Sequence, residues 1–344
     1  MDYQVIWFLL ITILFIGYFV LEGFDFGVGM LMPFISKDDT DRRVVVNTIG
    51  PFWDANEVWL ITAGGAMFAA FPHWYATLFS GFYLPLFLMV VALILRAVGF
   101  EFRSKMTQGW WRKTADQFIF WGSLVPALLW GVAFTNIVMG LPIGENMYFT
   151  GNLLSLLNPY ALMGGVTVVL LFMLHGALFL SLRTTGELKE RAEKFANRLW
   201  IPVGIIIAAF GILGYWNTML FEGLGLVPGS LPTLAAICYI ATFVFMRYKM
   251  QGYAFASIAA TIVFGAAVLF HGLFPNVMPS SIDAAYSLTI YNASSSQLTL
   301  KIMSIVALFF VPIVLAYQGW SYWVFRQRVT REAVTGEAVS GEKE

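Results

Sequence analysis

The stretch IWFLLITILFIGYFVLEGFDFGVGMLM, residues 6–32, decides the fold of this chain. It runs for 27 residues with only two charged side chains, Glu22 and Asp25. About 20 apolar residues are enough for a helix to cross the hydrocarbon core of a bilayer. The stretch lacks the basic start and small-residue cleavage site of a signal peptide, so we expect a retained first span. The sequence therefore predicts a membrane protein that holds acids inside the bilayer.

The composition of the whole chain agrees with this prediction. Of its 344 residues, 59% are hydrophobic and 12% are charged, and the mean hydropathy is +0.76. A soluble domain has about twice that share of charge. The net charge is zero, which argues against nucleic acid as a partner. The single cysteine, Cys238, excludes an internal disulfide and a cysteine-based metal site within the chain.

Eight further apolar stretches follow the first one, so the sequence predicts an all-α integral membrane protein with nine transmembrane helices. We expect one transmembrane domain over residues 1–328 and a flexible cytoplasmic tail over 329–344, where apolar residues are few. The predicted spans lie near residues 6–32, 50–71, 74–100, 115–139, 159–182, 199–221, 231–247, 253–273 and 299–326.

Basic residues are distributed very unevenly among the connections between the predicted spans. Nineteen of the twenty Lys and Arg residues lie in or beside the connections on one side, and Lys301 is the exception. Cytoplasmic connections carry an excess of Lys and Arg in membrane proteins. Nine spans then predict an N-terminus outside the membrane and a C-terminus in the cytoplasm. The longest connections on the other side, 140–158 and 274–297, are rich in turn-forming residues and are expected to cap the outer face.

Four acids lie within two of the predicted spans. Glu22 and Asp25 are three residues apart in the first span, and Asp54 and Glu57 are three apart in GPFWDANEVWL, residues 50–60. Residues three apart share one face of a helix. Counted from the basic ends, the two pairs lie at similar depth near the cytoplasmic boundary, and Arg96 of the third predicted span lies at a matching level.

A carboxylate near the bilayer centre costs about 2.5 to 3.5 kcal/mol on insertion scales, so four of them close together are poorly tolerated without partners or water. They must therefore face protein or a wet cavity. Burial and mutual repulsion favour the protonated form of the carboxyl groups, whereas Arg96 and the positive N-terminal end of the second span favour the anion near Asp54. Such opposed influences suit groups that take up and release protons. The alternative is a static ion-pair cluster that locks the first three helices together.

The histidines do not form a metal motif. His73, His175 and His271 are far apart in the sequence, and none is paired at the spacing of a shared metal site. A haem needs only one or two axial ligands, so single histidines do not exclude it. We nevertheless expect hydrogen-bonded or interfacial roles for them. Aromatic residues cluster at the span ends, where they are typical of membrane-interface anchors, as at Trp320, Tyr322 and Trp323.

Several of these stretches together resemble subunit II of the cytochrome bd quinol oxidases, and the resemblance covers nearly the whole chain. The stretches are GFDFGVG (23–29), GPFWDANEVWLITAGGAMFAAFP (50–72), VGFEFRSK (98–105), FPNVMPS (274–280) and SLTIYNASSSQLTL (287–300). The motif of the second span is specific. For the fold, the resemblance implies two four-helix bundles and one additional peripheral helix.

For function, the resemblance implies a complex in a bacterial cytoplasmic membrane that oxidises quinol and reduces dioxygen to water. It implies that two b-type haems, one d-type haem and the quinol-oxidising loop belong to the larger subunit I, and that this chain is a haem-free partner. A small single-helix subunit, membrane lipids and quinone are further candidate partners. A proton-coupled transporter and a pure assembly scaffold are the alternatives.

The resemblance also bears on single residues. In the family, the acid of the WD pair in the second span is implicated in a proton path, which here is Asp54 beside Trp53. Asp25, in the GFD motif, is the second candidate, and Glu22, Glu57 and Arg96 complete the predicted path. Members often carry an amide where this chain has Glu57, so the sequence leaves open whether Glu57 conducts protons or only forms an ion pair.

Overall fold

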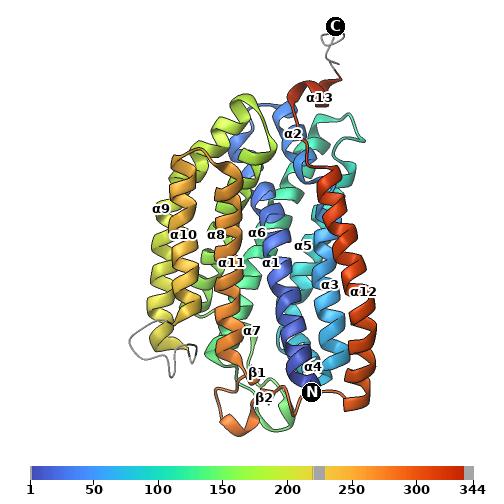
Figure 1. Ribbon diagram of the computed structural model, residues 1–344, viewed down its shortest axis with the longest axis vertical. Coiled ribbons are helices and arrows are strands. Elements are labelled where there is room, and N and C mark those ends of the chain that lie inside the picture. Colours follow the sequence, from blue (N-terminus) through green and yellow to red (C-terminus); the bar gives the residue numbers. More distant parts are fainter. Residues whose placement is uncertain (1, 219, 221–228, 337–344) are drawn as a thin grey trace.

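The computed structural model describes residues 2–218, 220 and 229–336, and long helices standing side by side dominate this part of the chain (Figure 1). Eight of the described helices are long and apolar enough to cross a membrane. They are α1 (Tyr3–Ile35), α5 (Tyr83–Phe102), α6 (Gly109–Met139), α8 (Pro159–Arg183), α9 (Gly186–Asn217), α10 (Ser230–Arg247), α11 (Gln251–Leu273) and α12 (Gln297–Val324).

The remaining predicted span, 50–71, coincides with helix α3 (Trp53–Ala70), which has 18 residues. Asp54 and Glu57 lie in its first turns and lower the hydropathy of its 18 residues, so it is not among the eight helices above. It packs along α1 and also contacts α12 (Figure 1). This packing brings Glu57 close to Arg96, the ion-pair partner of Glu22.

The single span predicted at 74–100 requires correction, because two helices occupy it. Helix α4 (Pro72–Gly81) ends before α5 begins at Tyr83, and Phe82 between them has non-helical dihedral angles. Pro85 explains the break: it has no N–H to donate to the carbonyl of Gly81, and its ring would clash with that carbonyl in a continuous helix.

Two more boundaries differ from the sequence prediction. Helix α9 begins at Gly186, well before the predicted start at residue 199, because the polar segment before the span continues the same helix. The connection after the first span contains a helix of its own, α2 (Asp39–Ile49), which Asp38 caps by accepting a hydrogen bond from the Asp41 N–H. Helix α2 and the start of α9 lie at the same end of the molecule, where Lys and Arg residues gather; this is the charged end.

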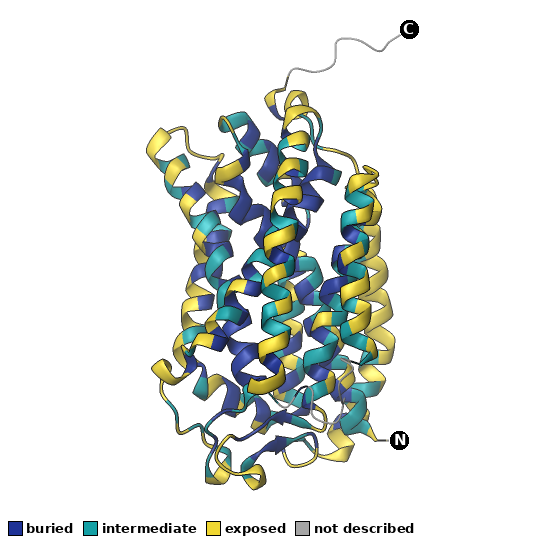
Figure 2. Ribbon diagram, turned by 90° about the vertical axis from the view of Figure 1, so that its left-hand side faces the viewer, coloured by how far each residue is buried: buried dark blue, intermediate teal, exposed yellow. Residues whose placement is uncertain are grey.

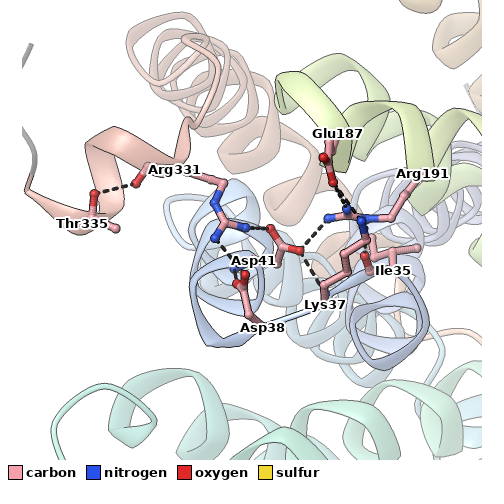
Figure 3. Close-up of polar contacts among 8 residues, drawn as sticks. All are labelled: Ile35, Lys37, Asp38, Asp41, Glu187, Arg191, Arg331 and Thr335. Atoms are coloured by element: carbon pink, nitrogen blue, oxygen red, sulfur yellow. Dashed lines mark hydrogen bonds and ion pairs between the residues drawn. The ribbon is translucent and has the colours of Figure 1, made fainter.

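Helix α13 (Arg331–Thr335) lies at this end as well, close to α2 (Figure 1). Asp41 is almost fully buried and accepts from Arg331, from Arg191 at 2.5 Å and from the Lys37 N–H at 2.9 Å (Figure 3). Arg331 also pairs with Asp38 at 2.8 Å. The structure thus differs from the flexible tail expected over 329–344: ion pairs and backbone bonds hold residues 329–336, and residues 337–344 lie outside the described part.

The contact between α2 and α13 should depend on pH. The Arg331 guanidinium beside Asp38 holds the pKa of that carboxyl below its usual value. The Asp38–Arg331 pair is therefore fully formed at neutral pH and is lost as the pH falls through the lowered pKa of Asp38. We expect Arg331→Gln to speed amide exchange of residues 331–335 by up to about fivefold, since exposed ion pairs are weak.

Hydrogen exchange with mass spectrometry measures this effect. Lys105→Gln is the matched control, because it removes an exposed pair with Glu101 (3.5 Å) elsewhere at the same end. Unchanged exchange in Arg331→Gln would show that the pair does not hold α13.

At the opposite end, the two long connections, 140–158 and 274–297, pack on one another. They contain the short elements η1 (Glu145–Met147), α7 (Leu153–Leu156), η3 (Ala284–Tyr286) and the antiparallel strands β1 (Asn276–Met278) and β2 (Leu288–Thr289). The Ser280 hydroxyl, almost fully buried, donates to the Ile143 carbonyl at 2.6 Å and so ties the two connections together. Helix α1 begins at this end, and α13 lies at the other (Figure 1).

Helix α1 is largely buried and lies in the middle of the bundle (Figure 1). Phe15 and Phe19 pack edge-on against Phe134 of α6, with ring centroids 5.4 and 5.3 Å apart. Farther along α1, Gly27 meets Gly176 of α8, where the backbones touch. Helix α12 is the opposite case, because Leu300 is its only buried residue among those described.

Candidate functional site: a buried carboxylate cluster

Three helices place three of the four predicted acids together with Arg96. Glu22 and Asp25 on α1 are fully buried, as is Arg96 on α5, and the Glu57 side chain on α3 is 20% exposed. Small residues allow this convergence: a Cβ on Gly122 of α6 would lie 2.5 Å from the Cβ of Arg96. Glu22 and Glu57 thus both lie beside Arg96, and Asp25 lies about one helical turn from Glu22 on α1.

Arg96 is the centre of the cluster. Its Nη1 forms an ion pair with Glu22 and lies 3.9 Å from Oε2 of Glu57. The guanidinium carbon is 4.6 Å from the ring centroid of Phe26 and 5.2 Å from that of Phe100. The charge is thus shared between two carboxylates and two aromatic faces, which partly offsets its removal from water.

Asp25 belongs to a neighbouring hydrogen-bond chain. Asn56 of α3 donates to Oδ2 of Asp25 at 2.7 Å, and the Asn56 carbonyl oxygen accepts from Tyr322 at 2.7 Å and from Gln318 at 3.3 Å. Gln318 in turn accepts from Trp59 Nε1 at 2.8 Å. The chain links α1, α3 and α12 through polar groups at the level of the acids.

Asp54 lies apart from this interior. It is exposed on the first turn of α3, and within the described part of the chain it forms no ion pair or hydrogen bond. Trp53 beside it is buried and packs against Phe100, with ring centroids 5.3 Å apart. Of the six predicted site residues, Asp54 alone faces outward.

The exposure of the side chains decreases from Asp54 to Glu57 to Glu22. Several buried polar atoms of the cluster also have unused hydrogen-bonding capacity. Within the described residues, Glu22 Oε2, Asp25 Oδ1, Arg96 Nε and Arg96 Nη2 are buried without a hydrogen-bond partner from the protein. Buried polar atoms are normally satisfied by protein or by water. The arrangement can therefore bind water between carboxylates and pass protons along it.

The structure adds residues that the sequence analysis missed. Asn56 and Gln318 carry neutral amides, and an argument from charged residues in apolar stretches does not identify such side chains. Tyr322 requires a correction: it is not an interface anchor, because it stacks on Phe52 at a centroid distance of 4.4 Å and donates to Asn56. The available signal was the position of Asn56, two residues after Asp54 and on the α3 face toward α1.

The histidines contribute neither a metal centre nor a member of the cluster. His175 is fully buried, stacks on Phe255 with centroids 4.7 Å apart, and bonds the Val20 carbonyl through Nε2 at 3.0 Å. His73 and His271 are exposed. Among the described residues, no group of three or more His, Cys, Asp or Glu side chains is placed to hold a metal ion.

Comparison with known proteins identifies the family of this chain. The family described as cytochrome bd terminal oxidase subunit II matches residues 3–325. A relative from Bacillus subtilis, "Cytochrome bd ubiquinol oxidase subunit 2", is 46% identical over 94% of this chain and 96% of its own length. The Escherichia coli K12 "Cytochrome bd-I ubiquinol oxidase subunit 2" is 38% identical over 96% of each chain.

A solved structure, "The structure of bd oxidase from Geobacillus thermodenitrificans", contains a chain with the same fold. The TM-score is 0.78 at 16% sequence identity, over 94% of this chain and 99% of that one. At this identity the likeness bears on the fold alone. The family match and the relatives, which extend over the carboxylate cluster, decide the identity. The chain belongs to the cytochrome bd terminal oxidase subunit II family.

Proposed function

We propose that this chain is the second subunit of a quinol oxidase in a bacterial cytoplasmic membrane, and that it supplies part of a path for protons from the cytoplasm. The names of the relatives support the enzyme class. The observation that carries the path is the graded series of Asp54, Glu57 and Glu22, which runs from an exposed to a fully buried carboxyl group next to Arg96. Reduction of dioxygen to water consumes protons, so a proton supply is chemically required, and we propose that it comes from the cytoplasm.

The membrane orientation is part of this proposal. Helices α2 and α13 and the start of α9 gather Lys, Arg and their partners at one end, and we place that end in the cytoplasm. The N-terminus is then outside and the C-terminus inside. The proposed spans are α1, α3, α5 and α6 as one four-helix group, α8 to α11 as a second, and α12 as the peripheral helix.

The face formed by α3, α5 and α12 is proposed to bind subunit I. It exposes large apolar side chains, including Ile61 (70% exposed), Phe87 and Phe309, which lipid would also cover. Asp54 on the same face is different, because a carboxylate exposed to lipid is costly. A partner subunit that provides polar groups or water beside Asp54 removes that cost.

The residues of this chain do not fit a haem within the described part. His175 is the one buried histidine, its ring is packed against Phe24 and Phe255, and it lines none of the described cavities. This supports placing the two b-type haems, the d-type haem and the quinol-binding loop in subunit I. The work left to this chain is to hold protons at carboxyl oxygens and to position them.

Within the proposed path, Asp54 receives a proton at the subunit boundary and passes it inward by way of Glu57. Arg96 keeps Glu22 and Glu57 oriented and compensates their charge. Asp25 exchanges protons with the same region, held in place by Asn56 and Tyr322. Water bound by the unpaired oxygens of Glu22 and Asp25 connects the carboxyl groups.

The replacement Asp54→Asn tests this path. We expect oxygen consumption with quinol to fall by on the order of 10-fold or more, because the amide cannot carry a proton, while the haem spectrum of the complex stays intact. Glu101→Gln is the matched control, an exposed carboxylate on α5 that pairs with Lys105 outside the cluster. Normal turnover by an assembled Asp54→Asn complex would remove Asp54 from the path.

The two alternatives make different predictions. A pure scaffold predicts that replacing Asp54, Glu57 and Asp25 one at a time alters the yield of complex and never its turnover per haem. A proton-coupled transporter predicts that the chain purifies without a haem-bearing partner. Purification in mild detergent, followed by an optical spectrum and mass spectrometry, separates these outcomes.

A further inference from the structure

A cavity of about 490 Å³ lies at the charged end of the molecule, on the side away from α3 and α12. The ends of α8, α9, α10 and α11 form its walls, and it shares no lining residue with the carboxylate cluster. Its volume is within the usual range for small-molecule sites, about 300 to 1,000 Å³. The cavity lies where the apolar parts of α10 and α11 end, hence at a membrane boundary whichever way the chain is oriented.

One wall of the cavity is a rigid aromatic stack. Trp200 of α9 stacks on Phe243 of α10 with ring centroids 4.5 Å apart, and on Tyr239 at 5.4 Å. Trp200 Nε1 donates to the Tyr239 carbonyl at 3.2 Å, and the Tyr239 hydroxyl donates to the Trp200 carbonyl. Tryptophan at a membrane boundary commonly lies at headgroup level.

Two cations at the rim have no acidic partner. Arg247 lies over the Phe243 ring at 5.1 Å, and Lys249 follows in a turn whose backbone has a positive φ of 55°. Within the described part of the chain neither forms an ion pair. The one acid in the lining, Glu193, is already engaged, since it accepts from Gln251 at 2.8 Å and pairs with Lys189 at 3.6 Å. The cavity is therefore left with net positive charge.

We propose that this cavity binds the headgroup of an anionic phospholipid. The phosphate would lie between Arg247 and Lys249, and the glycerol region would lie against the aromatic wall. The acyl chains would follow the apolar surface of α9 and α10, where Ile201, Ile240 and Val244 are 61%, 58% and 42% exposed. Figure 2, which views the molecule from this side, shows exposed residues along the long helices. A free phosphate would use the two cations and leave this apolar surface unused, so the geometry favours a lipid.

Native mass spectrometry of the purified complex tests the proposal, after exchange into nanodiscs with equal amounts of phosphatidylglycerol and phosphatidylethanolamine. The variant is the double replacement Arg247→Gln and Lys249→Gln. The matched control is Lys194→Gln with Arg198→Gln, which removes the same charge from exposed positions on α9 outside the cavity lining. Each basic residue near a membrane surface contributes about fivefold to binding of anionic lipid, so the double variant should bind phosphatidylglycerol roughly 25-fold more weakly.

The expected result is retention of phosphatidylglycerol by wild type and control and its loss from the double variant. An intact haem spectrum shows that the variant complex is assembled. Equal retention by wild type and double variant would overturn the proposal. It would also be overturned if inorganic phosphate displaced the lipid at low millimolar concentration, because the site would then be one for free anions. Neither result bears on turnover, so failure here is distinguishable from failure of the proton path.

Discussion

Arg96→Gln is expected to destabilise the assembled protein by about 3 to 5 kcal/mol, because it leaves the buried Glu22 without its counter-charge. A carboxylate fully removed from water must then be held charged without a partner or neutralised, and both are unfavourable. Glu57, 3.9 Å away from Arg96, loses part of its compensation as well. Scanning fluorimetry of the solubilised complex should show a Tm lower by on the order of 10 °C.

A double replacement in the cluster separates the contribution of charge to stability from that of packing. Glu22→Gln together with Arg96→Gln removes both charges, so the loss should be smaller than for Arg96→Gln alone. Arg96→Lys is a second informative variant, since it keeps the charge and gives up the fit between Phe26 and Phe100. If the double variant were as unstable as Arg96→Gln, packing of the guanidinium between those rings, and not its charge, would account for the loss.

The sequence alone was enough to predict a cluster of charged residues, because charged side chains are easy to recognise within long apolar stretches. Few ionisable residues occur within the apolar stretches, so Glu22, Asp25, Glu57 and Arg96 could be identified and placed at one level by counting residues along straight helices. Their convergence followed from the cost of leaving any of them in lipid. The same reasoning could not show that Asp54 faces outward, because that depends on the rotation of α3 about its axis.

Neutral partners and helix interruptions were harder to predict for two different reasons. Asn56 and Tyr322 are 266 positions apart, and nothing local in the sequence relates an amide on α3 to a phenol on α12. The break at Phe82 did have a local signal in Pro85, but proline is tolerated within many membrane helices, as Pro126 is within α6. Tertiary packing decides which prolines end a helix.

The close crossing of α1 and α8 predicts a second large effect. A Cβ on Gly27 would lie 1.9 Å from the Phe172 carbonyl oxygen and 2.8 Å from the Gly176 backbone nitrogen. These are backbone atoms that cannot rotate away, so Gly27→Ala must separate the two helices. Overpacking of side chains costs about 1 to 3 kcal/mol, and a clash with backbone should reach or exceed the upper value. We expect a large loss of assembled complex, measured as haem per milligram of membrane protein.

Separation of α1 and α8 should also displace the carboxylates, since Asp25 lies two residues before Gly27 on the same helix. In the fraction of Gly27→Ala that assembles, turnover per haem should therefore fall as well. Gly265→Ala on α11 is the matched control, because no atom lies within 4 Å of its added Cβ, and it should assemble and turn over normally. Normal assembly of Gly27→Ala would mean that α1 and α8 do not touch in the complex. Poor assembly with unchanged turnover would mean that the crossing supports the fold without setting the position of Asp25.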